Sequence, residues 1–420
     1  MVNEKKSSKN LKNADFDECV KKGISGEIKL YALEKTLSCS DSVVARRKII
    51  EKKTKTSLEH VSDYNFDVNV ASKKNIENMI GATQIPLGVA GVVKINGDYA
   101  KGEFYVPMAT TEGALLASVN RGMSVITKSG GAVTFVDNRG MTRAPVFRTT
   151  GLKESRELVK WTENNFNRIK KVVESTTRFG KLMEIKPWIV GRNVYLRFVF
   201  DTKDAMGMNM AVMACEKVIV ELIEKEIKAE CVALSGNMCV DKKPSALNFI
   251  EGRGKSVHAE IVIKKDFVVN TLKTTPKDVV EVNYRKNLLG SAMAGSLGFN
   301  AQFANIVAAI FAATGQDIAH VGEASMGVTT AEMHGDDLYV SCYLPNLNVG
   351  TVGGGTGLIG QKEALSIMGV TGDAAPGENT LKFAEIISVA VLAGEISLLS
   401  ALASGHLAKA HAVHGRGKDK

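Results

Sequence analysis

The sequence predicts an α+β fold. A large helix-rich domain is built around a long central helix, with an inserted β-α-β-β-α-β (ferredoxin-like) unit and a small helical N-terminal domain. Three observations carry this prediction. Residues 146–235 alternate strand and helix patterns in the order of a split βαβ unit. Residues 287–316 contain no charged residue, as in a buried helix. Residues 17–54 have a short and heavily charged helical pattern.

The chain has 420 residues, 45% hydrophobic and 24% charged, which is enough for two or three domains. We expect a helical N-terminal domain over 1–80, a large domain over 81–145 and 236–420, and the inserted unit over 146–235. The two ends of a split βαβ unit emerge near one another, so the unit can be an insertion. Its fold does not specify a function, because the same fold hosts many.

The N-terminal half contains several local signals. Asp41 and Ser42 are predicted N-caps of the helix that follows them. Strands over 85–95 and 103–106 are predicted to form a hairpin with its turn at Asn96-Gly97. Thr110-Thr111 predicts a helix starting at Glu112, where the helix dipole favours a carboxylate. Glu112 is therefore a candidate site residue, with a simple capping acid as the alternative.

The remaining elements are predicted from periodicity and from glycine and proline positions. In the inserted unit we expect strands over 146–149, 179–190, 193–200 and 231–234, and helices over 153–175 and 205–228. The rest of the chain is expected to form strands over 257–263 and 339–344, a helix over 287–314, a glycine-rich loop over 350–355 and a helix over 378–411. Gly315 suits the exit of the helix over 287–314. Asp317 lies just past that end, where the dipole disfavours a carboxylate, so we expect it to have a cationic partner.

Composition excludes some classes of protein. A net charge of +9 suits an anionic ligand, whereas the 6% aromatic content disfavours base stacking on RNA. The predicted strand VYLRFVF (194–200) also does not match RNP1, a sequence motif of RNA-binding domains. Six cysteines without a CxxC predict reduced thiols in a cytoplasmic protein, with no metal site. No apolar signal segment opens the chain, and the apolar runs 303–313 and 386–403 are expected to be buried helices.

One charged stretch stands out, SGNMCVDKKPSALNFIEGRGK over 235–255. Lys242 and Lys243 are adjacent ammonium groups that repel each other unless an anion offsets them, although paired solvated lysines are the ordinary alternative. With Glu112, Asp317 and His411, this lysine cluster would suit reduction of a carbonyl group. A lysine can stabilise a developing oxyanion by ~3–4 kcal/mol, and a carboxylic acid or histidine can supply protons. For His411, the alternative is a basic helix end that only complements the dipole.

Seven colinear segments resemble 3-hydroxy-3-methylglutaryl-coenzyme A (HMG-CoA) reductase. They are ENMIGATQIPLGVAG (77–91), ATTEGALLASVNRG (109–122), DAMGMNM (204–210), SGNMCVDKKPSALNFIEGRGK (235–255), GSAMAGSLGFNAQFANIVAAIFAATGQD (290–317), GTVGGGT (350–356) and GHLAKAHAVH (405–414). The resemblance covers about 77–415 and is greatest to the class I type in its soluble archaeal form, since no membrane anchor precedes the catalytic part.

The resemblance implies a four-electron reduction of (S)-HMG-CoA to (R)-mevalonate and CoA with NADPH, a committed step of isoprenoid biosynthesis. Glu112 matches the catalytic glutamate, Lys242 the lysine that stabilises the oxyanion, and Asp317 the aspartate that orients both. His411 matches the histidine that protonates the CoA thiolate. The matched substrate-binding residues are Ser118, Asn120, Arg121, Arg143, Ser235, Asp241, Lys243, Lys286 and Asn305.

The inserted unit then resembles the family's cofactor domain. The matched cofactor-binding residues are Thr177, Arg178, Asp204, Met206, Gly207, Met208, Asn209, Gly353 and Gly354, and Arg178 favours NADPH over NADH. A class II, NADH-preferring enzyme is the alternative within the family. The resemblance also implies a homo-oligomer, dimer or tetramer, whose active site lies between subunits, with the lysine loop and the long helix meeting across the interface. No membrane or nucleic-acid partner is implied.

Overall fold

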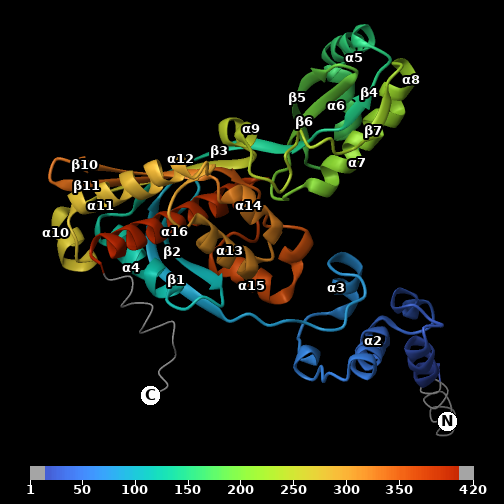
Figure 1. Ribbon diagram of the computed structural model, residues 1–420, viewed down its shortest axis with the longest axis horizontal. Coiled ribbons are helices and arrows are strands. Elements are labelled where there is room, and N and C mark those ends of the chain that lie inside the picture. Colours follow the sequence, from blue (N-terminus) through green and yellow to red (C-terminus); the bar gives the residue numbers. More distant parts are fainter. Residues whose placement is uncertain (1–14, 406–420) are drawn as a thin grey trace. The chain divides into compact units, whose positions relative to one another are not determined.

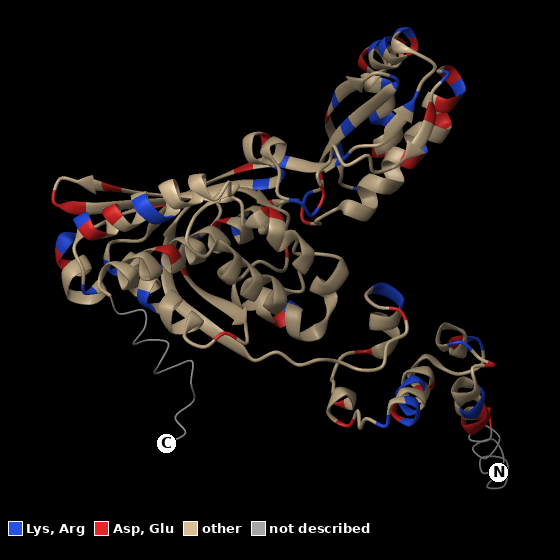
Figure 2. Cartoon of the chain, in the orientation of Figure 1, with Lys and Arg blue, Asp and Glu red and all other residues tan. Residues whose placement is uncertain are grey.

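The computed structural model describes residues 15–405. The chain divides into two compact units, the first of Met1–Ile85 with Leu358–Gly360 and the second of Pro86–Gly357 with Gln361–Lys420. Helices and strands mix throughout the second unit (Figure 1). Charged side chains are dense on the N-terminal helices and on residues 146–235, and sparse over the helices at the centre of the second unit (Figure 2).

The first unit consists of short helices with small apolar cores. They are a helix over 15–25, η1 (Leu30–Lys35), α2 (Cys39–Thr54), η2 (His60–Ser62) and α3 (Val68–Lys74). One core gathers Cys19, Leu33, Ala45 and Ile49. The N-cap of α2 is Ser38, whose hydroxyl accepts from the Asp41 N–H, so the predicted caps Asp41 and Ser42 were wrong. Ser38 is the N-cap because the helix begins three residues earlier than the apolar periodicity suggested.

The second unit contains an eleven-stranded sheet. Its strands outside residues 146–235 are β1 (Leu87–Asn96), β2 (Lys101–Ala109), β3 (Ala132–Arg143), β8 (Gly254–Ile263), β9 (Gly298–Phe299), β10 (Gly327–His334) and β11 (Asp337–Leu347). The order is β3–β8–β11–β10–β9, and β1 joins β2 and β3. The predicted hairpin is present, but its turn spans Gly97–Ala100 because the Gly97 N–H bonds the Ala100 carbonyl.

Residues 146–235 contribute β4 (Val146–Arg148), α5 (Leu152–Asn164), α6 (Phe166–Glu174), β5 (Lys181–Val190), β6 (Asn193–Asp201), α7 (Met208–Val218), the π-turn η3 (Ile219–Ile223), α8 (Glu224–Glu226) and β7 (Glu230–Ala233). The four strands pair in the order β7–β4–β6–β5, all antiparallel. The single helix predicted over 153–175 is two helices, because Asn165 leaves helical geometry (φ −105°, ψ 13°) between them. The helix predicted from 205 begins at Met208, after Gly207 at φ +88°.

The remaining elements surround the large sheet. They are α4 (Leu115–Lys128), α9 (Ala246–Glu251), α10 (Lys265–Phe267), η4 (Val268–Leu272), α11 (Pro276–Val282), η5 (Asn283–Gly290), α12 (Ser291–Met293), α13 (Phe303–Thr314), η6 (Ile318–His320), α14 (Val321–Ala324), η7 (Gly354–Gly357), α15 (Ile359–Ile367) and α16 (Glu378–Ala403). The largest apolar core lies between the sheet and α4, α13 and α16.

The continuous helix predicted over 287–314 was wrong. The chain leaves the π-helical η5 and α12 at Gly295, which adopts φ +66°, and forms β9 before α13 begins at Phe303. The start of α13 is fixed by Glu395, whose carboxylate accepts from the N–H groups of Ala301 (2.8 Å) and Gln302 (2.6 Å). The helix exit at Gly315 (φ +68°) agrees with the prediction.

Helix α16 is the core helix of the second unit. It is one helix in the described residues that is long and apolar enough to cross a bilayer by length and composition, and 83% of its apolar window is buried within the protein. It ends at Ala403, short of the predicted 411, and residues 406–420 lie outside the described chain. Its buried Glu385 accepts from the N–H groups of the hairpin turn, at 3.2, 3.0 and 2.5 Å.

Burial raises the pKa of both Glu385 and Glu395, although their N–H donors act in the opposite direction. Both carboxyls are fully buried, and each replaces the bulk water that would otherwise satisfy loop N–H groups. The helix therefore orders two loops, the hairpin turn and the start of α13, through side chains in its own interior face.

Backbone contact between α4 and α16 gives a sharp stability test. A Cβ at Gly122 would lie 1.9 Å from the Ala393 carbonyl oxygen. Gly122→Ala is therefore expected to lower the free energy of unfolding by about 1–3 kcal/mol through overpacking. Gly360→Ala is the matched control: it lies in α15 with no atom within 4 Å of its Cβ, so it should be neutral or slightly stabilising. Urea denaturation checks both, and equal stability of the two variants would contradict the close approach.

Candidate active site

Lys242 lies in a strained loop between β7 and α9. Three residues of this loop without the freedom of glycine, Asn237, Val240 and Lys242, have φ of +64°, +50° and +63°. Strained backbone persists where surrounding contacts enforce it, and it clusters at functional sites. Here the Lys242 N–H donates to the Glu323 carboxylate, and the Asn248 side chain donates to the Val240 carbonyl at 3.2 Å. The loop is therefore held by its backbone, which leaves the lysine side chain available.

The Lys242 ammonium Nζ lies 2.7 Å from Asp317 Oδ2 within one chain. Asp317 follows the Gly315 exit of α13 and caps η6 by accepting from the Ala319 N–H at 3.1 Å. Burial alone would raise the pKa of Asp317, but the hydrogen bond from Lys242, the neighbouring His320 and the Ala319 N–H together lower it. This acid past a helix end thus has the cationic partner that its position called for.

A buried charge network lies behind this pair. Arg253 and Glu323 are both fully buried, with Arg253 Nη1 2.8 Å from Glu323 Oε1. Arg253 Nη2 lies 3.0 Å from Asp241 Oδ1, and Arg143 Nη2 lies 3.5 Å from the other oxygen of Asp241. Asp241 is therefore held between two guanidinium groups. This places Asp241 and Arg143, both candidate site residues, next to the lysine loop.

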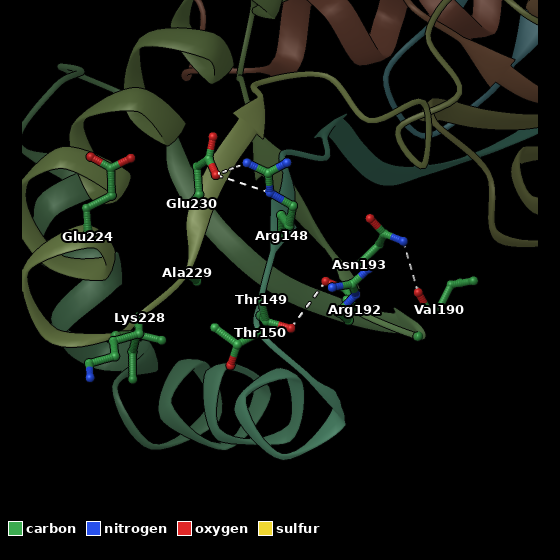
Figure 3. A pocket seen from close by; sticks show the side chains of 12 residues that line it. Arg148, Thr149, Thr150, Val190, Arg192, Asn193, Glu224, Lys228, Ala229 and Glu230 are labelled. Carbon is green, nitrogen blue, oxygen red and sulfur yellow. Dashed lines mark hydrogen bonds and ion pairs between the residues drawn. The ribbon is translucent and has the colours of Figure 1, made fainter.

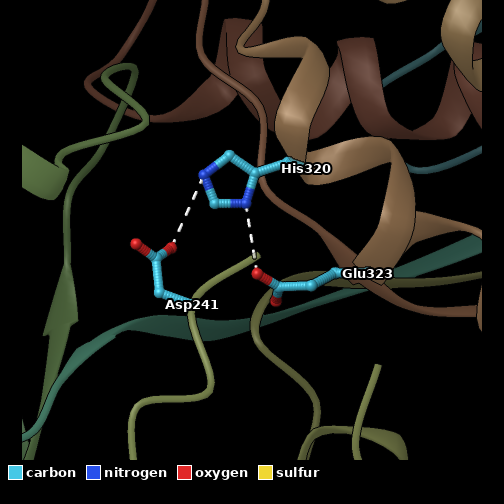
Figure 4. A group of neighbouring side chains, drawn as sticks. All are labelled: Asp241, His320 and Glu323. Atoms are coloured by element: carbon cyan, nitrogen blue, oxygen red, sulfur yellow. Dashed lines mark hydrogen bonds and ion pairs between the residues drawn. The ribbon is translucent and has the colours of Figure 1, made fainter. Parts of the chain in front are cut away.

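Asp241, His320 and Glu323 bring three potential metal ligands together (Figure 4). His320 Nδ1 lies 3.2 Å from Glu323 Oε1, and its Nε2 lies 3.7 Å from Asp241 Oδ1. Arg253 already provides a cation that contacts both carboxylates. A metal ion here would have to compete with that buried guanidinium, so these residues fit an ion-pair network better than a metal centre.

Ser235 and Lys243 belong to the same loop. The Ser235 hydroxyl lies 3.5 Å from the Cys239 thiol, which in turn lies 3.8 Å from Arg143 Nη1. The exposed Lys243 ammonium donates to the Asp241 carbonyl of its own loop at 3.1 Å. The structure therefore brings together six of the sequence-derived candidates, which are Arg143, Ser235, Asp241, Lys242, Lys243 and Asp317.

A second group of candidates gathers at the other end of α13. Asn305 Nδ2 lies 3.4 Å from Glu112 Oε1. Glu112 is exposed and precedes α4, whose N-cap is Ala114, so its predicted position in a first helical turn was wrong. The Thr110 hydroxyl bonds the Glu112 N–H at 3.0 Å and keeps this segment out of the helix. The exposed Lys286 on η5 lies close enough to lower the pKa of the buried Glu395, against the larger upward effect of burial.

Ser118, Asn120 and Arg121 face the core rather than the lysine loop. Arg121 Nη2 donates to the Ser397 carbonyl of α16 at 2.6 Å, and Ser118 bonds the Ser397 hydroxyl at 2.9 Å. Asn120 Oδ1 accepts from the Gly91 N–H of β1 at 2.8 Å. Burial lowers the pKa of Arg121. These three side chains fix α4 on its neighbours.

The two glycine-rich candidate segments lie side by side. The Asp204 carbonyl accepts from the N–H groups of Thr351 (2.7 Å) and Val352 (3.2 Å). A Cβ on Gly350 would lie 2.5 Å from the Met206 nitrogen, so only glycine permits this approach. The Asp204 carboxylate accepts from the Gly377 N–H at 2.7 Å and thereby caps α16. Gly353 and Gly354 are open to solvent, with φ of +82° and +54°.

The other cofactor candidates differ in exposure. Met208 is buried, with its sulfur 3.0 Å from Arg253 Nη2, whereas Asn209 is exposed in the first turn of α7. Thr177 accepts from the Gly180 N–H at 3.1 Å. The exposed Arg178 guanidinium lies 5.1 Å from the centre of the Phe179 ring. His411, the fourth catalytic candidate, lies outside the described residues.

Two cavities bear on these segments. One of about 270 Å³ is lined by Thr351, Val352, Gly353 and the facing residues Val370, Gly372 and Asn379. Another of about 870 Å³ lies where β4, β7 and the β5–β6 turn end (Figure 3). Its Arg148 pairs with Glu230, and both side chains are exposed. None of the candidate residues that the structure describes lines the larger cavity, so it is separate from their site.

Sequence reasoning missed His320, Glu323 and Asn348. Asp317, His320 and Glu323 recur at every third position, a spacing that places side chains on one face of a helical turn. That repeat was a usable signal. Asn348 had no signal, because its Nδ2 reaches Glu323 Oε2 (3.0 Å) only through the end of β11.

The lysine–aspartate pair, its buried charge network and the adjoining glycine-rich loops are features of an enzyme active site. A family model described as hydroxymethylglutaryl-coenzyme A reductase matches residues 42–416. The chain is 54% identical to 3-hydroxy-3-methylglutaryl-coenzyme A reductase of Pyrococcus horikoshii over 410 residues, covering 96% of this chain and 99% of that one. It is likewise 54% identical to the enzyme of Methanocaldococcus jannaschii, over 96% and 100%. The chain belongs to the hydroxymethylglutaryl-coenzyme A reductase family.

More distant relatives agree with this assignment. The chain is 45% identical to reductase 1 of Dictyostelium discoideum, covering 97% of this chain and 75% of that one. A solved class II reductase of Streptococcus pneumoniae, described as bound to NADPH, has a TM-score of 0.63 at 18% identity, with coverage of 89% and 100%. At that identity the structural likeness shows the shared mixed helix-and-sheet fold.

Proposed function

We propose that this protein reduces (S)-HMG-CoA to (R)-mevalonate and CoA with NADPH, a committed step of isoprenoid biosynthesis. Family membership supports the activity, and the observation that carries the chemistry is the Lys242–Asp317 contact of 2.7 Å at the strained loop. NADPH, when bound, supplies a hydride in each of two reductions, first of the thioester and then of the aldehyde. Each reduction also consumes a proton, and the protein must stabilise oxygen-centred negative charge in both.

The residues divide these tasks. Lys242 is positively charged beside Asp317 and stabilises the oxyanion of the substrate, and Asp317 holds it in place. Glu112 supplies the proton to the carbonyl oxygen. His411 protonates the CoA thiolate, so that it cannot add back to the aldehyde. The test of the function is NADPH absorbance: purified protein should oxidise NADPH only when HMG-CoA is added, and folded protein that does not would exclude this reaction.

We assign the anionic end of the substrate to the cations Arg143 and Lys243 and the hydroxyl of Ser235, with Asp241 as the anchor of the site. Asp241 already contacts the guanidinium groups of Arg143 and Arg253, so it positions cations rather than meeting the substrate carboxylate directly. Asp241 and the substrate carboxylate would repel each other because both are anions, whereas the exposed Lys243 ammonium attracts an anion.

We further propose a homo-oligomer, at least a dimer, with the active site between subunits. Glu112 and Asn305 meet at the start of α13, whereas Lys242 and Asp317 meet past its end. A helix of 12 residues is about 18 Å long. The two groups from one chain are therefore too far apart to contact one carbonyl, and a partner would bring its own Glu112, Lys286 and Asn305 to the Lys242 of this chain.

One face of the large sheet suits such an interface. Val133 and Phe135 on β3 are 50% and 51% exposed. Across the strands, Phe135 faces His258, and His258 stacks on Tyr343 with ring centres 4.4 Å apart. Solvated sheet faces are usually polar, so this apolar ladder is more typical of a covered surface.

The proposed reductase function also assigns a role to each domain. Residues 146–235 form a ferredoxin-like cofactor domain inserted between 81–145 and 236–420, with 1–80 as a separate helical domain; the strand order β7–β4–β6–β5 supports the split βαβ unit. The DAMGMNM and GTVGGGT segments, which lie together, receive the pyrophosphate part of NADPH. We favour a class I, cytoplasmic enzyme; the low identity of 18% to the solved class II neighbour is compatible with a different class.

Arg178 provides the test of cofactor choice. Arg178→Gln is expected to raise KM for NADPH about tenfold or more and leave KM for NADH nearly unchanged, because a charged hydrogen bond to the 2′-phosphate is lost. The matched control is Arg192→Gln, an exposed arginine in the β5–β6 turn, at the opposite end of the strands. Steady-state kinetics with both cofactors decides the matter, and equal losses with NADPH and NADH would make Arg178 a structural residue.

A further inference from the structure

His320 is a fully buried imidazole directly behind the Lys242–Asp317 pair, and none of the roles above uses it. Its Nε2 lies 3.7 Å from Asp317 Oδ2 and 3.7 Å from Asp241 Oδ1. The same nitrogen has no hydrogen-bond partner among residues 15–405. A buried ring nitrogen aimed between two carboxylates, but bonded to neither, is poised for a contact that forms in another state of the enzyme.

Asn348 settles which ring nitrogen carries the proton. Its Nδ2 lies 3.0 Å from Glu323 Oε2 and 3.2 Å from His320 Nδ1. An amide group has two hydrogens, so each of these acceptors receives one. Glu323 also accepts from Arg253 and from the Lys242 N–H, and it does not need a proton from the ring. Nδ1 therefore accepts, and the ring hydrogen lies on Nε2, facing Asp317 and Asp241.

The Nε2–H group of His320 acquires a hydrogen-bond acceptor when substrate binds. When an oxyanion develops, the Lys242 ammonium must move from Asp317 toward it, and Asp317 loses part of its strongest hydrogen bond. We propose that His320 is a positioning residue: its Nε2–H then donates to Asp317 and holds that carboxylate in the orientation that keeps Lys242 aimed at the substrate. This inference rests on the proposed reductase function. The other charged groups that face the ring are Asp241 and Glu323, with Arg143 and Arg253 behind them.

The kinetic test compares His320→Leu with His320→Gln. Leucine removes the donor, and kcat for HMG-CoA reduction should fall about tenfold or more while KM for NADPH stays within about twofold. The N–H stabilises the Asp317 anion, so its loss should move the acidic limb of the kcat–pH profile to higher pH. Glutamine offers an amide N–H at similar reach and should restore most of the activity and the original limb.

If His320 has only a structural role, different results are expected. Such a role would give His320→Leu a lower melting temperature with an unmoved acidic limb and a kcat close to that of wild type in the folded fraction. That result would overturn the proposal. Because leucine could prevent folding altogether, NMR of isotope-labelled histidine in the wild-type enzyme provides the second measurement, with His320→Gln identifying the signal. The Nε2–H tautomer is expected, and the Nδ1–H tautomer would refute the inference.

These measurements separate the two proposals. If wild-type protein does not oxidise NADPH with HMG-CoA, the reductase function fails and the kinetic role of His320 falls with it. If the wild type is active and His320→Leu keeps its kcat and pH profile, only the His320 proposal fails.

Discussion

Lys242→Met is expected to lower kcat for HMG-CoA reduction by about 10²–10³-fold, equivalent to about 2.7–4 kcal/mol of lost oxyanion stabilisation. Methionine keeps the length of the side chain and removes the ammonium that lies 2.7 Å from Asp317. The fold should survive, because the Lys242 side chain is 43% exposed and the loop is held through its backbone N–H to Glu323.

Lys243→Met is the matched control for this variant. Its ammonium is exposed and, within the described part of the chain, bonds the carbonyl of Asp241 in the same loop, so its loss should mainly raise KM for HMG-CoA and leave most of kcat. Steady-state kinetics with circular dichroism checks both proteins. The assignment of Lys242 would be wrong if a folded Lys242→Met enzyme kept more than about a tenth of the wild-type kcat.

Arg253→Met is expected to have the largest effect on stability, about 3–5 kcal/mol in the free energy of unfolding. The change removes a fully buried guanidinium that contacts Glu323, Asp241 and the Thr142 hydroxyl. Glu323 then remains as a buried carboxylate without its main countercharge. Urea denaturation at neutral pH measures the loss.

The control and the pH dependence sharpen this test. Arg139→Met removes an exposed guanidinium paired with Asp137, and should change stability by no more than about 0.5 kcal/mol. Burial alone would raise the pKa of Glu323, but the neighbouring His320 and the charge of Arg253 lower it below the ordinary value of 4.5. The stabilisation it gives the wild type is present above that value and is lost as pH falls.

The difference between wild type and Arg253→Met should therefore shrink as the pH falls below 4.5, since protonated Glu323 no longer needs a countercharge. A difference in stability that stays constant from neutral pH to acid would show that the arginine acts through packing alone.

Local patterns were enough to predict most of the strands, although β3, β9 and β10 were missed, and helix ends depended on distant residues. The succession of strands and helices along 146–235 followed from periodicity and from the turn at Gly191, which are short-range signals. The helix predicted from 287 was broken because Gly295 turns the chain and Glu395 caps α13 from 94 residues away. No window of sequence contains both partners, so periodicity could only report that the segment is apolar.

The site divides in the same way. Family resemblance placed Lys242 and Asp317 as partners, and their contact lies within one chain. The distance between Glu112 and Lys242 along α13 could not be predicted, because the positions of residues in the sequence do not give the distance between two loops in space. The buried network could be found only in part: Asp317, His320 and Glu323 repeat every three residues, yet their pairing with Arg253 and Asn348 needs the folded sheet.

Helix α16 is anchored at three positions along its axis, by Asp204 at its first turn and by its own Glu385 and Glu395. Each residue of an α-helix turns the next by about 100°. A single residue inserted or deleted between Glu385 and Glu395 would thus rotate one carboxylate away from its loop while the other stayed bound. The number of residues between Glu385 and Glu395 is therefore fixed by the two loops they bind. Insertions and deletions in this family should be confined to segments outside 385–395.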